Sequence, residues 1–438
     1  MTHATQKEAY PYFVLAVLLF SLQLVFGLLT IAKYIWPDPL IGLLPFNTTR
    51  AIHINLLVFW LLLGFMGGTY YMIPEESDTD LYSTVLAKVQ FYMLAVAGVS
   101  AVTGYVLGFS WGMPFLEQPT PIKILIVIAV LIFLFNVFMT VMKTRRWTAI
   151  QGVLTGGMVL LAVMFLFGIV FMKNLATQYY FWWWVIHLWV EGAWELITGA
   201  IMAFLLMKLT GVERGKVEKW LYVEIGLVLF TGIIGTGHHY YWIGTPEYWY
   251  WWGGIFSALE PLPILFMVID TMRDVRERQV EIKNRVALHW AVGCAWFHFV
   301  GAGVWGFAHT LPQVNRWTHG TQVTASHGHM AFFGAYAMVN LTMIYFALPR
   351  LKGINKFDQG RGITSFWIMV SGMALMGLAL AVAGIVQVYF NRIMGVDFLT
   401  TQDYMRLWFM VTMASAGFFA AGAYLFVYDF FTMKESKT

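Results

Sequence analysis

Cysteine is almost absent from this sequence, and charged side chains are scarce. The single cysteine among 438 residues, Cys294, excludes a disulfide framework, an iron–sulfur cluster held by thiolates and covalent heme attachment through C-x-x-C-H. Only 11% of the residues are charged, whereas soluble domains use roughly a quarter. Hydrophobic residues make up 59%, and the mean hydropathy is +0.68. An ordinary soluble enzyme is therefore excluded, and most of the surface is expected to face lipid.

Long apolar runs indicate helices that cross a bilayer, each of which needs about 20 residues. A transmembrane barrel would instead show short strands of alternating polarity, but the run Ile124–Val141 is apolar on both parities. The sequence therefore predicts an all-α polytopic membrane protein, one transmembrane domain over residues 1–438. The twelve predicted spans are 12–35, 51–73, 81–109, 121–142, 148–172, 179–207, 217–237, 253–273, 284–308, 321–349, 362–390 and 404–432.

Basic residues are distributed unevenly between the two sides of the predicted bundle. Most of the 27 Lys and Arg residues fall in the tails and in the loops on the same side as the tails. The positive-inside rule then places both termini in the cytoplasm. The bases do not gather on one face as a nucleic-acid site requires, so no nucleic-acid partner is expected.

Histidines stand out in the predicted spans, where an ionisable group is costly and is a functional candidate by default. A lone histidine would ordinarily be a hydrogen-bonded polar contact, and a pair at a span end could be interfacial. Six in such an ion-poor interior favour ligands for cofactors or metals. They are His53, His187, His238, His239, His327 and His329.

The spacing of these histidines gives their directions on regular helices. His187, Glu191 and Glu195 stand at i, i+4 and i+8, and so share one face. Histidine and carboxylates on one face are typical of iron sites within helix bundles. His327 and His329 are about 200° apart and cannot ligate one metal. Two flat cofactors on opposite sides of that helix would explain them; Gly328 would leave room, and a non-covalent heme fits a chain with one cysteine.

Four blocks of the sequence resemble the heme–copper oxidase superfamily. Within it they resemble the large catalytic subunit of cytochrome-c-dependent nitric oxide reductases, and the resemblance covers essentially the whole chain. It implies a subunit I-like fold of twelve helices in a bacterial inner membrane. The blocks are Trp182–Glu195, Gly235–Trp242, Phe256–Pro263 and His319–Met330.

The resemblance implies a role for each buried histidine. His53 and His329 would be the axial ligands of a low-spin heme b, and His327 the proximal ligand of a high-spin heme b. A non-heme iron would be held by His187, His238, His239 and Glu191.

Glu191 is the residue that best separates the related enzymes. It stands where classical oxygen reductases have a tyrosine, and an oxygen ligand suits iron better than copper(I). The alternative is an acid that hydrogen-bonds a ligand histidine from outside the coordination sphere.

Further acids and one arginine complete the implied site. Glu195 and Glu260 would deliver or hold protons, although Glu260, next to Pro261, could also satisfy backbone groups. Arg50 would pair with heme propionates or lie at the surface. Glu117 would contribute to a calcium site or face another element.

The implied reaction joins two molecules of nitric oxide, two electrons and two protons to give N2O and water. The sequence has no motif for a cofactor at which electrons could enter, so a membrane-anchored c-type cytochrome subunit is the expected partner, docked on the outer face.

An oxygen reductase on the same scaffold, with copper in the non-heme site, is one alternative. A transporter or channel with a His and Glu proton relay and no heme is another. We expect the remaining histidines to be packing or loop residues. These histidines are His3, His289, His298, His309 and His319. We expect Glu75 and Glu76 to face water, and the alternative is that they feed protons to the site.

Overall fold

The computed structural model describes residues 1–36, 40–144 and 147–436. Among these residues twelve helical segments are long and apolar enough to cross a membrane, and none forms a strand. The predicted all-α architecture and the number of spans are confirmed. The α-helices are α1 (Ala9–Ile35), α2 (Phe46–Ser77), α3 (Thr84–Val106), α4 (Thr120–Met142), α5 (Ala149–Phe167), α6 (Leu175–His187), α7 (Trp194–Thr210), α8 (Arg214–Gly235), α9 (Tyr248–Ser257), α10 (Leu262–Glu277), α11 (Arg285–His298), α12 (Trp305–Thr310), α13 (Pro312–Thr318), α14 (Gln322–Phe332), α15 (Met338–Leu351), α16 (Gly360–Gln387) and α17 (Phe398–Thr432).

Several spans change from α-helix to 3-10 or π-helix part-way along, and periodicity in the sequence does not reveal these changes. A π-helical turn hydrogen-bonds i to i+5 and often marks a functional site. The 3-10 segments are η1 (Ala4–Glu8) and η3 (Thr236–His239). The π-helical segments are η2 (Leu188–Ala193), η4 (Phe299–Val304), η5 (Phe333–Ala337) and η6 (Val388–Ile393).

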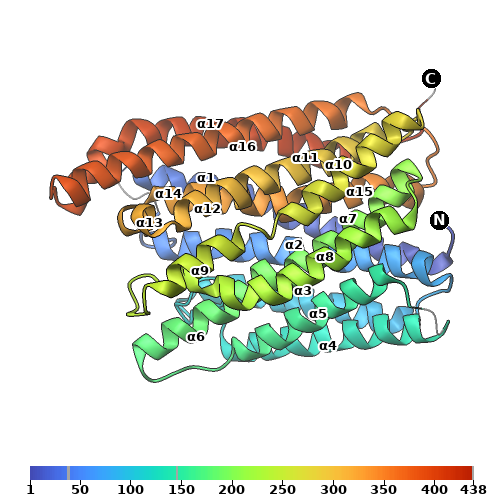
Figure 1. The fold of residues 1–438 in the computed structure, drawn as a ribbon, viewed down its shortest axis with the longest axis horizontal. Coiled ribbons are helices and arrows are strands. Elements are labelled where there is room, and N and C mark those ends of the chain that lie inside the picture. The colour runs from blue at the N-terminus through green and yellow to red at the C-terminus, as the bar shows by residue number, and fades with distance from the viewer. Residues whose placement is uncertain (37–39, 145–146, 437–438) are drawn as a thin grey trace.

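The helices lie side by side along the long axis of the molecule, and both termini lie at one end, called here the terminal end (Figure 1). Helices α16 and α17 form one edge of the bundle, while α4 and α6 lie at the opposite edge. The most apolar windows of Phe46–Ser77, Leu175–Thr210 and Gln322–Leu351 are 83%, 89% and 89% buried. These three spans are the central ones, and they carry four of the six histidines singled out above.

Ion pairs between helices hold the terminal end together. Glu75 lies 2.7 Å from Lys208, and both carboxylate oxygens of Glu76 accept hydrogen bonds from Arg214 at 3.0 Å. The Glu76 side chain is 2% exposed. The expectation that this acid faces water is therefore wrong, because the guanidinium of α8 covers it.

Candidate metal centre

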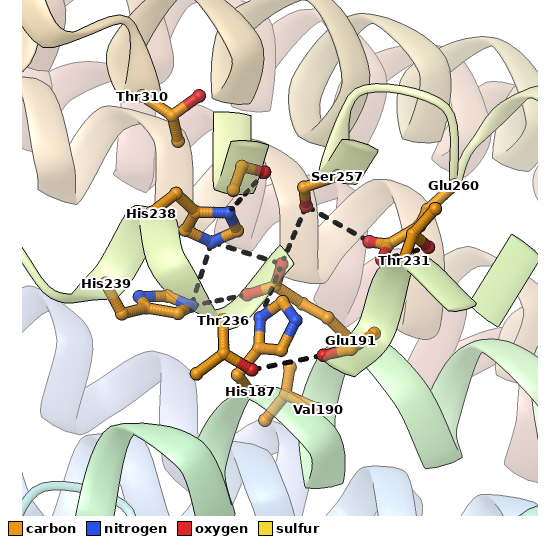
Figure 2. A network of polar contacts seen from close by, with 12 residues as sticks. His187, Val190, Glu191, Thr231, Thr236, His238, His239, Ser257, Glu260 and Thr310 are labelled. Carbon is orange, nitrogen blue, oxygen red and sulfur yellow. Dashed lines mark hydrogen bonds and ion pairs between the residues drawn. The ribbon is translucent and has the colours of Figure 1, made fainter. Parts of the chain in front are cut away.

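Three histidines and one glutamate converge toward the end of the bundle that lies opposite the termini. One ligand atom from each of His187, Glu191, His238 and His239 lies within 4.8 Å of all the others. Figure 2 shows the three imidazoles gathered around the Glu191 carboxylate. Glu191 Oε1 lies 3.0 Å from Nε2 of His239, and Oε2 lies 3.3 Å from Nδ1 of His187 and 3.5 Å from Nε2 of His238. The predicted set is thus brought together at one point.

The 3-10 segment η3 explains how two successive histidines reach the same point. Helix α8 tightens after Gly235, and the rings of His238 and His239 end 4.1 Å apart between centroids. Bare glycines let α9 pack against this segment: a Cβ at Gly253 would lie 2.2 Å from the backbone nitrogen of His238. The ring of Trp183, one turn before His187, stacks on His239 at 4.5 Å and 7° and so fixes its orientation.

The donor set fits a metal cation. The His187 side chain is fully buried, its Nε2 has no hydrogen-bond partner among the residues that the structure describes, and its Nδ1 has only the Glu191 carboxylate, 3.3 Å away. Buried polar atoms are normally satisfied, so a coordinated cation is the partner that this imidazole calls for. Three imidazoles and a carboxylate are ligands that suit iron.

A chain of oxygen atoms leads from Glu191 to α8. The hydroxyl of Ser257 lies 3.3 Å from Glu191 Oε2 and 3.1 Å from Glu260 Oε2. The hydroxyl of Thr231 lies 2.7 Å from the other oxygen of Glu260. Glu260 therefore bonds to side-chain hydroxyls, and the hydroxyl of Ser257 links it to Glu191 at the metal site.

Glu195 contacts a histidine outside the predicted metal set. The π-helical turn of η2 interrupts the regular spacing, and although Glu191 and Glu195 line the same cavity, Glu195 Oε1 meets Nε2 of His298 at 3.1 Å. Both side chains are almost fully buried. The expectation that His298 merely packs is wrong. Its position inside a predicted span was the available signal, since it marks this histidine as costly in the same way as the other six.

His53 and His329 face each other from α2 and α14. Their ring centroids are 6.2 Å apart and their planes differ by 27°. Each Nδ1 is held by a backbone carbonyl, that of Gln23 at 3.0 Å and that of Ala325 at 2.8 Å, which leaves Nε2 of each ring for a ligand. Two metal–imidazole bonds of about 2 Å each place ring centroids about 6 Å apart, so the pair fits axial ligation of one heme iron.

His327 points to the other side of α14, as its spacing predicts. Its Nδ1 lies 3.0 Å from the carbonyl of Gly301, and its ring lines a cavity together with Glu191, Glu195 and Glu260. The cavity has an empty volume of about 1000 Å³ when its open mouth is included. A Cβ at Gly328 would meet nothing within 4 Å, so the cavity extends over this residue. A large flat cofactor ligated by His327 fits here.

Arg50 and Glu117 lie near His53 but differ in burial. Arg50 is exposed in the first turns of α2. Glu117 is 4% exposed and accepts a hydrogen bond from Asn55 Nδ2 at 2.8 Å. Burial raises the pKa of Glu117, and the Asn55 hydrogen bond opposes that effect. Glu117 therefore faces α2, and its role as a calcium ligand stays a prediction.

Comparison with known proteins identifies the family of this chain. The family model described as cytochrome c and quinol oxidase polypeptide I matches residues 7–418. The chain belongs to this family. It is 46% identical to a nitric oxide reductase subunit of Stutzerimonas stutzeri, over 97% of this chain and 94% of that protein. It is 23% identical to a cbb3-type cytochrome c oxidase subunit of the same organism, over 92% and 89%. A cytochrome c oxidase subunit 1 of Rhodobacter capsulatus is 22% identical, over 79% and 68%. Within the family, the chain belongs with the nitric oxide reductases.

Proposed function

We propose that this chain is the catalytic subunit of a nitric oxide reductase, which joins two NO molecules with two electrons and two protons to give N2O and water. The observation that carries the proposal is the position of Glu191, whose two carboxylate oxygens lie within 3.5 Å of nitrogens of all three histidines. A hard oxygen donor at this point favours iron over copper(I). The 46% identity to a nitric oxide reductase subunit supports the same reaction.

The proposed cofactors follow the histidine geometry. A low-spin heme b would be held between His53 and His329, and a high-spin heme b by His327. When bound, the hemes and the iron would supply electrons and hold two NO molecules side by side, which makes N–N bond formation effectively intramolecular. Arg50 would pair with heme propionates, and Glu117 is the candidate calcium ligand. A non-heme iron would be held by His187, His238, His239 and Glu191.

The acids of this chain would handle the two protons. Glu260 would hold one at the carboxyl that bonds to Ser257 and Thr231, within one hydroxyl of Glu191. Glu195, bonded to His298, would hold the second on another wall of the same cavity. Carboxyls surrounded by apolar groups suit this task because they favour the proton-bearing form.

Electrons would come from a membrane-anchored c-type cytochrome subunit. Docking at the end of the bundle opposite the termini would bring it to the side where η3 and the first turns of α2 lie. The excess of Lys and Arg at the terminal end supports a bacterial inner membrane location with both termini in the cytoplasm.

Metal analysis and an optical spectrum of the purified two-subunit complex test the proposal together. We expect b-type heme signals in the reduced-minus-oxidised spectrum, one non-heme iron per chain, no copper, and N2O formed from NO. Stoichiometric copper with oxygen consumption and no NO consumption would identify an oxygen reductase. A preparation with proton transport and no heme would identify a transporter.

A further inference from the structure

A third acid, Glu224, lies buried near the centre of α8, ten residues from the start of the helix. Its side chain is 0% exposed. Neither carboxylate oxygen has a hydrogen-bond partner among the residues that the structure describes. An ionised carboxylate in such a place lacks compensating hydrogen bonds, so the neutral, proton-bearing acid is the resting form, and the carboxylate left when its proton leaves is a strong base that is quickly reprotonated.

The carboxyl of Glu224 packs against α7 at a glycine, Gly199. A Cβ at Gly199 would lie 1.9 Å from Glu224 Oε2, so glycine is what makes room for the carboxyl. Gly199 stands one turn beyond Glu195, and Glu195 is the titratable group whose charge acts on Glu224. The Glu224 carboxyl therefore packs on α7 one turn, about 5.4 Å along the helix axis, from the position of Glu195, and a bridging water is the link that we infer between the two acids.

Unsatisfied atoms on the neighbouring residues point to the same place. Glu195 Oε2 and His298 Nδ1 are also buried without a hydrogen-bond partner in the described part of the chain. Buried polar atoms of this kind are typically satisfied by ordered water. Glu195 and His298 bond to each other, Glu224 packs one turn of α7 away, and this group of three residues would be satisfied by shared water.

Along the face of α8 that carries Glu224, a polar side chain follows toward the metal centre and apolar ones follow toward the terminal end. Thr231, which bonds to Glu260, stands seven residues further on and so lies on the same face, two turns nearer to the metal centre. Toward the terminal end the same face carries Leu221 and Val217, both fully buried and apolar. The group can exchange protons with the site, but no polar side chain continues it along this face of the helix.

We propose that Glu224 is a proton-holding residue of the catalytic subunit, a store that passes one proton to Glu195 through a bridging water and is refilled through the same water when Glu195 next receives a proton. One O–H bond breaks at Glu224 and one forms at the Glu195 carboxylate, so no other reactant is needed. The role is that of a positioning and proton-storing residue that acts through Glu195. It rests on the proposed function, because Glu195 would consume its proton in NO reduction.

Infrared spectroscopy of the purified two-subunit complex tests the storage role without turnover. Protonated carboxyls give a C=O stretching band that shifts when H2O is replaced by D2O. We expect the H2O-minus-D2O difference spectrum of Glu224→Gln to lack one such band that the wild type shows. Gly226→Ala, two residues along α8 in open space, is the matched control and should keep the band. A Glu224→Gln spectrum identical to wild type would overturn the proposal.

Activity and a second variant complete the test. Glu224→Gln should lower kcat for NO several-fold with KM and both heme spectra unchanged. If Glu224→Gln does not assemble, Gly199→Ala decides, since the added methyl displaces the carboxyl and should shift the same band; an unshifted band overturns the proposal. A wild-type complex that shows the band but forms no N2O would instead refute the proposed reaction and leave the proton-bearing Glu224 established.

Discussion

The imidazoles of His53 and His329 face each other with 6.2 Å between ring centroids, and each Nδ1 bonds to a backbone carbonyl. Because both Nδ1 atoms are used, both Nε2 atoms remain for a metal between the rings. The two residues come from the second and tenth spans, and α1 must approach closely as well. A Cβ at Gly27 would lie 2.8 Å from Cε1 of His53. Three helices thus fix this pair.

Replacing one member of the pair should remove one cofactor. We expect His329→Ala to lose the low-spin heme and keep the high-spin heme, so that b-type heme per chain falls from two to one by pyridine hemochrome assay. His289→Ala, whose ring bonds to the backbone carbonyl of Arg285 near the terminal end, is the control and should keep both. An unchanged low-spin signal in His329→Ala would contradict the assignment.

Removing the carboxylate at the metal centre should abolish turnover without disturbing the hemes. Glu191→Ala deletes the group that contacts three imidazoles. Loss of a partner outside the coordination sphere typically costs 10–100-fold in metal affinity, and loss of a ligand should cost at least as much. We expect the non-heme iron to be lost, NO consumption to fall at least about 100-fold, and both b-heme signals to persist. Glu247→Ala, at an exposed position before α9, should behave as wild type. Retained iron at full occupancy would show that Glu191 acts from outside the coordination sphere.

The hydroxyl of Ser257 should matter for proton delivery. Ser257→Ala breaks the only hydroxyl bridge that the described residues form between Glu191 and Glu260. We expect kcat for NO to fall by about tenfold, just below the usual range for general acid–base catalysis, with a larger solvent isotope effect and unchanged iron content. Ser257→Thr keeps a hydroxyl and should restore most of the rate. Equal rates in Ser257→Ala and wild type would remove this path from the mechanism.

The ion pair at the terminal end should contribute to stability and not to activity. Glu76 accepts two hydrogen bonds from Arg214, but the arginine is 41% exposed, so screening limits the gain. A double-mutant cycle of Glu76→Gln and Arg214→Gln should give a coupling free energy of at most about 1 kcal/mol. Thermal unfolding in detergent measures it, and the NO reduction rate should not change. Strictly additive effects would show that the pair contributes nothing measurable.

The sequence could predict features of the site that depend on spacing within one helix, but not those that depend on contacts between helices. The 100° step of a regular helix is enough to separate His327 from His329, and the structure places them on opposite sides of α14. The contact of Glu195 with His298 could not be predicted in the same way. It depends on the π-helical turn of η2 and on which face of α11 packs against α7.

The sequence by itself determined the membrane class, the twelve spans and six candidate ligand histidines, because lipid admits long apolar helices and makes an ionisable group within a span conspicuous. Only the tertiary structure decided which groups meet. The convergence of His238 and His239 required a tightened 3-10 turn and bare glycines in α9, and the cover over Glu76 required α8 to reach α2. The place of Glu224 required Gly199 on the facing helix. Periodicity fixes the direction of a side chain on its own helix. The residues that it contacts depend on helix packing and on local changes from α-helix to 3-10 or π-helix.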